Sequence, residues 1–165
     1  MELYFLRHGI AVEKGTSGFA RDSERPLTDE GIQKMRKIAK AMKELDLSFD
    51  LILSSPFIRA KQTAEIVANE LDITEVLRFS MNLAVGGDPA MLIKEIKSDN
   101  SQKILLVGHE PYLSNAISML ISGHDDVAIL MKKGGLCKLT VDSLRFGKCA
   151  TLEWLIGPRQ ILYSV

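Results

Sequence analysis

Short apolar runs alternate with longer amphipathic segments along the 165 residues of the chain. A short apolar run bounded by charged or turn-forming residues is typical of a strand buried within a sheet. Ile104-Leu105-Leu106-Val107 is the clearest such run, and residues 3–6 and 51–53 follow the same pattern. The pattern as a whole predicts strands at residues 3–6, 51–53, 75–79, 103–107, 136–141 and 151–156.

Apolar residues recur at helical spacing in the segments between these strands. Thr28 is a typical N-cap, because two acidic residues follow it and an apolar face then continues to residue 45. Ser55-Pro56 predicts the start of a second helix, with Pro56 at its first position. The remaining helices are predicted over residues 88–96 and after residue 111.

The alternation of strands and helices implies crossover connections between strands. We therefore expect an α/β fold, a three-layer sandwich whose mostly parallel central sheet of about six strands has helices on both faces. No repeat or linker-like run interrupts the pattern, so residues 1–165 are predicted to form one domain. Residues 9–27 carry glycines, a proline and scattered charges, which predicts a surface loop.

Composition and charge exclude several classes of protein. The 21 Lys and Arg residues balance 21 Asp and Glu, which argues against a general nucleic-acid-binding protein. No apolar run approaches the roughly 20 residues of a membrane span, and the first residues lack the features of a signal peptide. Cys137 and Cys149 are too few for a disulfide framework, so we expect free thiols and a cytoplasmic location, without nucleic-acid or membrane partners.

Two arginines and two histidines fall where the predicted strands end. Arg7 and His8 follow the first strand, and His109 follows the strand at 103–107. Arg59 lies in the first turn of the helix that follows the second strand. Ligands of parallel sheets bind at the carboxyl ends of the strands. We therefore expect these four side chains to share one pocket.

Such a pocket suits a tetrahedral oxyanion. Guanidinium groups offer N–H donors in fixed forks that match phosphate, and helix N-termini add further N–H groups. A neutral imidazole is a nucleophile that can form a covalent phosphohistidine. Phosphoryl transfer depends mostly on positioning and on stabilising negative charge, so this set needs no metal.

Four segments resemble the signature sequences of the histidine phosphatase superfamily, which has the phosphoglycerate-mutase-like fold. They are the RHG signature in residues 6–9, R-x-L-T-x-x-G in residues 25–31, S-S-P-x-x-R-A-x-Q-T-A in residues 54–64 and V-G-H-x-P in residues 107–111. The short chain, without an inserted cap, most resembles the SixA-type phosphohistidine phosphatases of that superfamily.

The resemblance implies a role for each matching residue. It makes His8 the nucleophile and places Arg7, Arg59 and His109 in the phosphate pocket. Neighbouring motif residues are further candidates for binding substrate: Gly9, Ser54 and Arg25. Ser54 is equally consistent with a capping role, and Arg25 with anchoring the loop. The resemblance implies neither a metal nor a cofactor.

The chain departs from the family pattern at the proton donor. Many relatives that cleave phosphate esters carry a glutamate as general acid before the third helix, where this chain has Asn82 and no glutamate. An alkoxide leaving group needs protonation, worth about 10²–10⁴-fold in rate, whereas imidazole leaves much more readily. The departure favours phosphohistidine as substrate. Asp22, Asp88 and Glu110 stay open as alternative donors.

The leading hypothesis is a monomeric, metal-independent phosphatase that acts on phosphohistidine of a carrier or phosphorelay protein. A phosphomonoesterase for a small phosphate ester is the second hypothesis, and an inactive phosphate- or protein-binding module is the third. Nearby guanidinium groups favour the neutral form of His8, so we expect activity to fall on the acid side as His8 becomes protonated.

Overall fold

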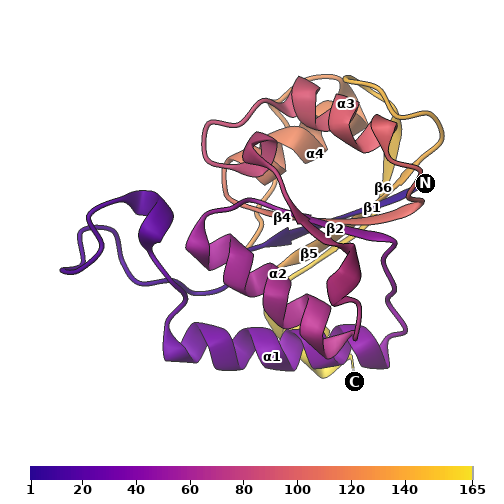
Figure 1. The fold of residues 1–165 in the computed structure, drawn as a ribbon. Helices are drawn as coiled ribbons and strands as arrows, with labels where there is room; N and C mark the ends of the chain where they lie inside the picture. Colours follow the sequence, from indigo (N-terminus) through magenta and orange to yellow (C-terminus); the bar gives the residue numbers. More distant parts are fainter. Residues whose placement is uncertain (165) are drawn as a thin grey trace.

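The computed structural model describes residues 1–164, which form a six-stranded sheet with helices on both faces (Figure 1). The strands are β1 (Glu2–Arg7), β2 (Leu51–Ser54), β3 (Leu77–Phe79), β4 (Lys103–Gly108), β5 (Leu136–Val141) and β6 (Ala150–Ile156). The α-helices are α1 (Asp29–Glu44), α2 (Ile58–Glu70), α3 (Pro89–Ser98), α4 (Tyr112–Ser122) and α5 (Pro158–Tyr163). Three 3₁₀ turns are η1 (Asp22–Glu24), η2 (Thr74–Val76) and η3 (Met81–Leu83).

The strand order is β3-β2-β4-β1-β5-β6, and the three-layer α/β prediction is confirmed. The sheet is mixed, however, whereas the strand–helix alternation predicts a mostly parallel one. β3, β2, β4 and β1 pair in parallel, but β5 is antiparallel to both β1 and β6. The loop after α4 returns the chain to the carboxyl end of β1, where Gly134 N–H donates to the Arg7 carbonyl, so β5 must run backwards.

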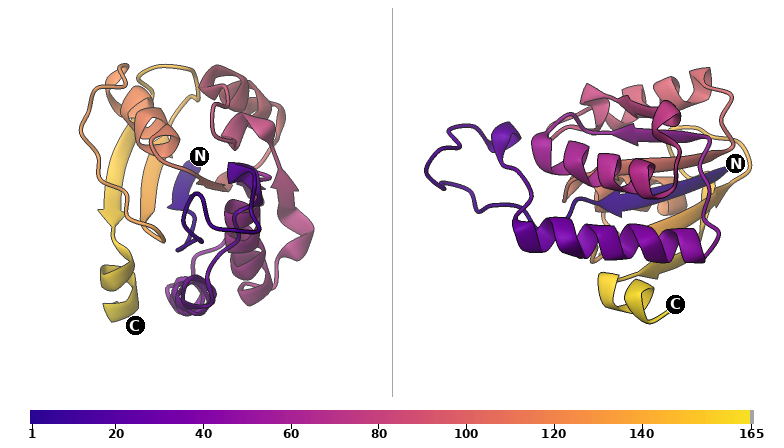
Figure 2. Two further views of the ribbon diagram at one scale, coloured as in Figure 1. Left: turned by 90° about the vertical axis from the view of Figure 1, so that its left-hand side faces the viewer. Right: turned by 60° about the horizontal axis from the view of Figure 1, so that its bottom comes forward.

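Alternating residues of β1 divide the core between the two faces of the sheet. Leu3 and Phe5 pack in the cluster that α3 and α4 cover, while Tyr4 and Leu6 pack in the cluster beneath α1, α2 and α5. Figure 2 shows these two layers. Within residues 1–164, no helix has the length and apolarity to cross a membrane.

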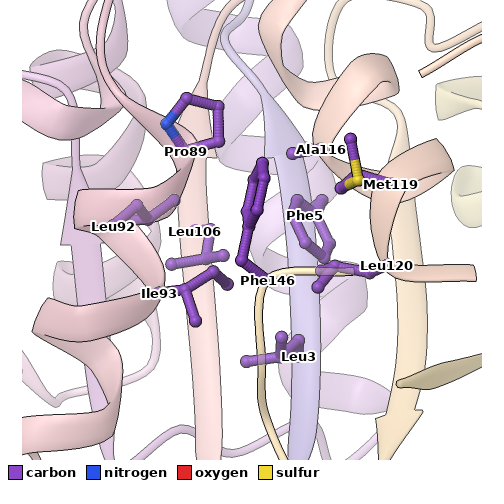
Figure 3. A pocket seen from close by; sticks show the side chains of 10 residues that line it. All are labelled: Leu3, Phe5, Pro89, Leu92, Ile93, Leu106, Ala116, Met119, Leu120 and Phe146. Carbon is purple, nitrogen blue, oxygen red and sulfur yellow. The ribbon is translucent and has the colours of Figure 1, made fainter. Parts of the chain in front are cut away.

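The face between α3 and α4 is closed by a side chain from the β5–β6 loop. Phe146, half exposed, lies over Phe5 and Leu106 of the central strands (Figure 3). The remaining cavity has a volume of about 10 Å³, too small for more than one water molecule. This face of the core is therefore filled by the protein's own side chains.

Two helices differ from the sequence prediction, and the strand predicted at residues 75–79 begins only at Leu77, after the 3₁₀ turn η2. The second helix begins at Ile58 with Phe57 as its N-cap, so Pro56 precedes the helix instead of occupying its first position. The terminal helix α5 was not predicted, because six residues are too few for a clear apolar period. Its Ile161 is fully buried against the α1 side of the core, so tertiary packing stabilises it.

The segment from Gly9 to Asp29 leaves the sheet edge as a projecting arm and returns at the start of α1 (Figure 2). Its base is held by Thr28 N–H donating to the Ile10 carbonyl and by a bridge between Ala11 and Leu27. The Thr28 hydroxyl accepts from Gly31 N–H, which confirms the predicted N-cap of α1.

Gly31 should be essential for the packing of this base. A Cβ at Gly31 would lie 2.0 Å from the Ile10 carbonyl oxygen, whereas Ala in a helix normally gains about 1 kcal/mol over Gly. The clash with backbone outweighs that gain, so we expect Gly31→Ala to lower the free energy of unfolding by about 1–3 kcal/mol. Urea denaturation measures it, with Gln33→Ala on the exposed side of α1 as control. A stabilised Gly31→Ala variant would contradict this packing.

Candidate active site

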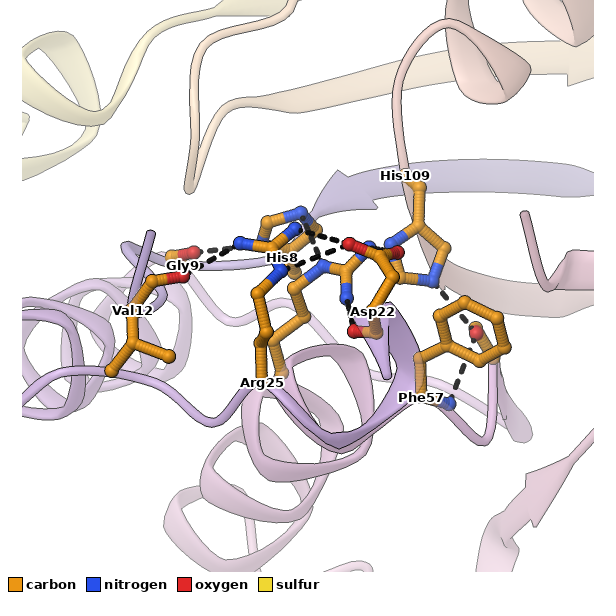
Figure 4. Close-up of polar contacts among 9 residues, drawn as sticks. His8, Gly9, Val12, Asp22, Arg25, Phe57 and His109 are labelled. Atoms are coloured by element: carbon orange, nitrogen blue, oxygen red, sulfur yellow. Dashed lines mark hydrogen bonds and ion pairs between the residues drawn. The ribbon is translucent and has the colours of Figure 1, made fainter. Parts of the chain in front are cut away.

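His8 follows β1 at the sheet edge and is 6% exposed. Its Nδ1 lies 2.7 Å from the Gly9 carbonyl oxygen, and its Nε2 lies 3.2 Å from Nε of Arg59 (Figure 4). A carbonyl accepts and a guanidinium N–H donates, so both contacts favour the same tautomer, with the proton on Nδ1 and the lone pair on Nε2. Nε2 therefore carries the lone pair needed for nucleophilic attack, and the hydrogen bond from Arg59 is released as phosphorus approaches.

Arg59 is held in the first turn of α2, as predicted, and its side chain is 3% exposed. Nη1 donates to the Asp22 carbonyl at 2.7 Å and Nη2 to the Asp22 carboxylate at 2.9 Å. The hydroxyl of Thr63 links the two elements, because it accepts from Gly9 N–H and donates to the Arg59 carbonyl. His8 and Arg59 are thereby fixed relative to each other.

His109 lies beyond the end of β4, and its ring centroid is 5.2 Å from that of His8. Its Nε2 is 2.7 Å from the Ser55 hydroxyl, and its buried Nδ1 has no hydrogen-bond partner within residues 1–164. If the Ser55 hydroxyl donates to Nε2, the His109 proton is on Nδ1 and becomes a donor for a bound anion.

Arg7 completes the cluster of four predicted residues. One of its Nη atoms donates to the Met131 carbonyl at 2.8 Å, and its buried Nε, like His109 Nδ1, lacks a partner among the described residues. Buried donors without partners are costly unless a ligand satisfies them. The arrangement can therefore accept an oxyanion beside the His8 lone pair.

The other three sequence candidates make structural contacts. Gly9 orients His8 through its carbonyl, and its N–H is bound to Thr63. The Arg25 guanidinium donates to the Val12 carbonyl and to Asp22, so it anchors the arm. The Ser54 hydroxyl donates to the Ser55 carbonyl. Sequence reasoning chose Ser54 and missed Ser55, which contacts His109.

The three acids left open by the sequence all have other partners. Burial raises the pKa of Asp22, but hydrogen bonds and charge from Arg25 and Arg59 outweigh burial and lower it overall. Asp88 caps α3, where it accepts from two backbone N–H groups, and Glu110 accepts from Ser114 N–H in α4. Each of the three carboxyl groups therefore already accepts hydrogen bonds from the protein.

Asn82, at the position of the absent glutamate, lies in η3. Its amide donates to Glu95 of α3 at 2.9 Å, and the Ser80 hydroxyl donates to the same carboxylate oxygen. A hydrogen bond to Glu95 of α3 therefore fixes the position of the Asn82 side chain. Within residues 1–164, no group of three His, Cys, Asp or Glu side chains is arranged to hold a metal ion.

Both pocket histidines are neutral over a wide pH range. Burial lowers the pKa of His8 to about 3, assisted by the charges of His109, Arg59 and Arg7. Burial and the neighbouring Arg59 likewise lower the pKa of His109 to about 3. The acid limb expected near pH 6.5 for an ordinary histidine is thereby displaced to much lower pH.

Comparisons with known proteins agree with this geometry. Residues 3–80 match the family model of the histidine phosphatase superfamily (branch 1). An uncharacterized protein of Picosynechococcus sp. is 33% identical, with 88% of each chain covered. The phosphohistidine phosphatase SixA of Escherichia coli is 26% identical over 96% of this chain and 94% of that protein. A solved structure of SixA with tungstate superimposes with a TM-score of 0.83 and 25% identity, covering 98% of this chain and 99% of that one.

The depressed pKa of His8 should appear as an acid-dependent loss of stability. The folded state binds fewer protons than the unfolded state between pH 6.5 and about 3, so the free energy of unfolding falls as pH falls through that window. The loss is up to about 1.4 kcal/mol per pH unit for the His8 proton. Since His8→Gln lacks this proton, the stability of wild type relative to the variant should drop by about 2–3 kcal/mol from pH 7 to 4.5. Urea denaturation at both pH values measures it, and a constant difference would contradict it.

Ser55 and Ser54 make a matched pair of variants. Ser55→Ala removes the hydrogen bond to His109, so we expect affinity for inorganic phosphate to fall about tenfold. Ser54→Ala leaves that hydrogen bond intact and should change the affinity by less than about threefold. Isothermal titration calorimetry measures both affinities. A larger loss of phosphate affinity in Ser54→Ala than in Ser55→Ala would instead indicate that Ser54 binds the substrate.

Proposed function

The chain belongs to the histidine phosphatase superfamily, and from that premise we propose that it hydrolyses phosphohistidine on a carrier or phosphorelay protein through a phospho-His8 intermediate. The observation that carries the proposal is a nucleophile and an oxyanion pocket without a poised proton donor. Asp22 is ionised between two arginines, Asp88 caps α3, Glu110 accepts from Ser114 N–H in the first turn of α4, and Asn82 is an amide.

The first step is in-line attack by His8 Nε2 on phosphorus. The Nδ1–H remains bonded to the Gly9 carbonyl, which stabilises the positive charge that develops on the His8 ring. Arg7 Nε and His109 Nδ1 supply donors for the phosphoryl oxygens. Water then attacks the phospho-His8 phosphorus, and inorganic phosphate and neutral His8 are released.

The leaving group explains why no general acid is needed. When an alkyl phosphate is cleaved, an alkoxide must be protonated, which contributes about 10²–10⁴-fold to the rate. When the P–N bond of a ring-protonated phosphohistidine breaks, the bonding electrons neutralise the imidazolium and a neutral imidazole departs. The absence of a carboxylic acid that could protonate the leaving group therefore costs little for this substrate.

A side-by-side substrate comparison tests the proposal. In EDTA, we expect faster phosphate release from a phosphohistidine-bearing carrier protein than from p-nitrophenyl phosphate or sugar phosphates. His8→Ala should reduce the release by about 10⁴-fold because the nucleophile is lost. When a reaction with ³²P-labelled substrate is quenched in acid, the P–N bond of phospho-His8 should hydrolyse and the label should be lost from the protein. When it is quenched in alkali, the label should remain on His8.

His124→Ala is the matched control, since His124 lies in the exposed loop after α4. It should retain wild-type activity. Preference for the phosphate esters would instead make the protein a small-molecule phosphomonoesterase. Activity retained in His8→Ala, or lost in EDTA, would contradict the proposed mechanism.

A further inference from the structure

Asp22 lies at the mouth of the pocket, between Arg25 and His109 (Figure 4). One carboxylate oxygen accepts from Arg25, with its Nε at 2.9 Å, and the other accepts from Arg59 Nη2 at 2.9 Å. The Asp22 side chain is 32% exposed, compared with 3% for Arg59. A carboxylate is thus held in place on the solvent side of the buried guanidinium.

The Arg59 guanidinium separates this carboxylate from the nucleophile. Its Nε edge contacts His8 Nε2, and its two Nη atoms contact Asp22. An in-line displacement places the leaving group opposite the nucleophile. A leaving group carried by a protein enters from the solvent side, and Asp22 lies on that side of Arg59.

Phosphate still has donors in this arrangement. A guanidinium has five N–H groups, and three of those of Arg59 bind His8, the Asp22 carbonyl and the Asp22 carboxylate, which leaves two. A carboxylate beside them nevertheless repels a phosphate ester, which brings only negative charge. The repulsion is offset when the leaving group itself carries positive charge.

We propose that Asp22 is a specificity-determining residue whose carboxylate accepts a hydrogen bond from the ring N–H of the leaving imidazolium. In the transfer, the His8 Nε2 lone pair forms the new N–P bond and the old P–N bond breaks. Its electron pair returns to the leaving ring, which departs as neutral imidazole and keeps its N–H proton. Asp22 therefore does for the substrate ring what the Gly9 carbonyl does for His8, without giving or taking a proton.

This inference rests on the proposed function and deepens it. It requires Asp22 to favour substrates with a protonated ring nitrogen and to disfavour esters, whose leaving groups offer no N–H. If the carboxylate only anchored the arm, its removal would change the rates for both kinds of substrate by the same factor. If the carboxylate only blocked the pocket, its removal would raise the rates for both kinds of substrate.

The test compares Asp22→Asn with wild type on phosphoimidazole and on p-nitrophenyl phosphate. We expect kcat/KM for phosphoimidazole to fall about 10- to 100-fold and that for p-nitrophenyl phosphate to stay level or rise. Glu24→Gln, an equal change of charge in the same 3₁₀ turn, is the control and should leave the ratio unchanged. If Asp22→Asn leaves the ratio of the two kcat/KM values unchanged, the inference about Asp22 is overturned while the proposed function still stands.

A second measurement uses only wild type, so it does not depend on how well the variant folds. N-methylated phosphoimidazolium carries the positive charge but lacks the ring N–H. We expect its rate acceleration over the uncatalysed reaction to be about tenfold smaller than that of phosphoimidazole. Equal rate accelerations for the two compounds would contradict the proposed hydrogen bond to Asp22. Hydrolysis of the ester but not of phosphoimidazole would overturn the proposed function as well.

Discussion

The hydrogen bond from Arg59 Nε to His8 Nε2 is the interaction around which the pocket is arranged. It joins the end of β1 to the first turn of α2, and Thr63 reinforces the same junction through Gly9. The contact has a donor only on the arginine side, so it requires a neutral imidazole with its proton on Nδ1. The Gly9 carbonyl satisfies that requirement by binding Nδ1, which leaves Nε2 as the hydrogen-bond acceptor and the nucleophile.

The same geometry balances charge in a small space. Burial disfavours protonation of both imidazoles, and the positive charges of Arg7 and Arg59 close to the rings add to this effect. Asp22 offsets part of this charge at the mouth, where it also pairs with Arg25. An oxyanion completes the balance, because it supplies acceptors for the buried Arg7 Nε and His109 Nδ1. The pocket is arranged for a ligand with a dense negative charge.

The sheet supplies the rigidity that this balance needs. The parallel ends of β1, β2 and β4 bring Arg7, Ser55 and His109 to one edge. The loop that leads into the antiparallel strand β5 adds a further support, because the Met131 carbonyl in this loop accepts a hydrogen bond from Arg7. That support comes from the half of the chain outside the match to the family model, which ends at residue 80.

The α/β architecture and the gathering of Arg7, His8, Arg59 and His109 follow from patterns that are visible in the sequence. Strand ends and motif spacing are local signals, and parallel strands necessarily bring their carboxyl ends together. Three features became apparent only in the folded molecule: Ser55 instead of Ser54 contacts His109, β5 runs antiparallel to β1, and Asp22 pairs with Arg59. These outcomes depend on the direction of each backbone segment at its end and on contacts between residues far apart in the chain, which local periodicity does not encode.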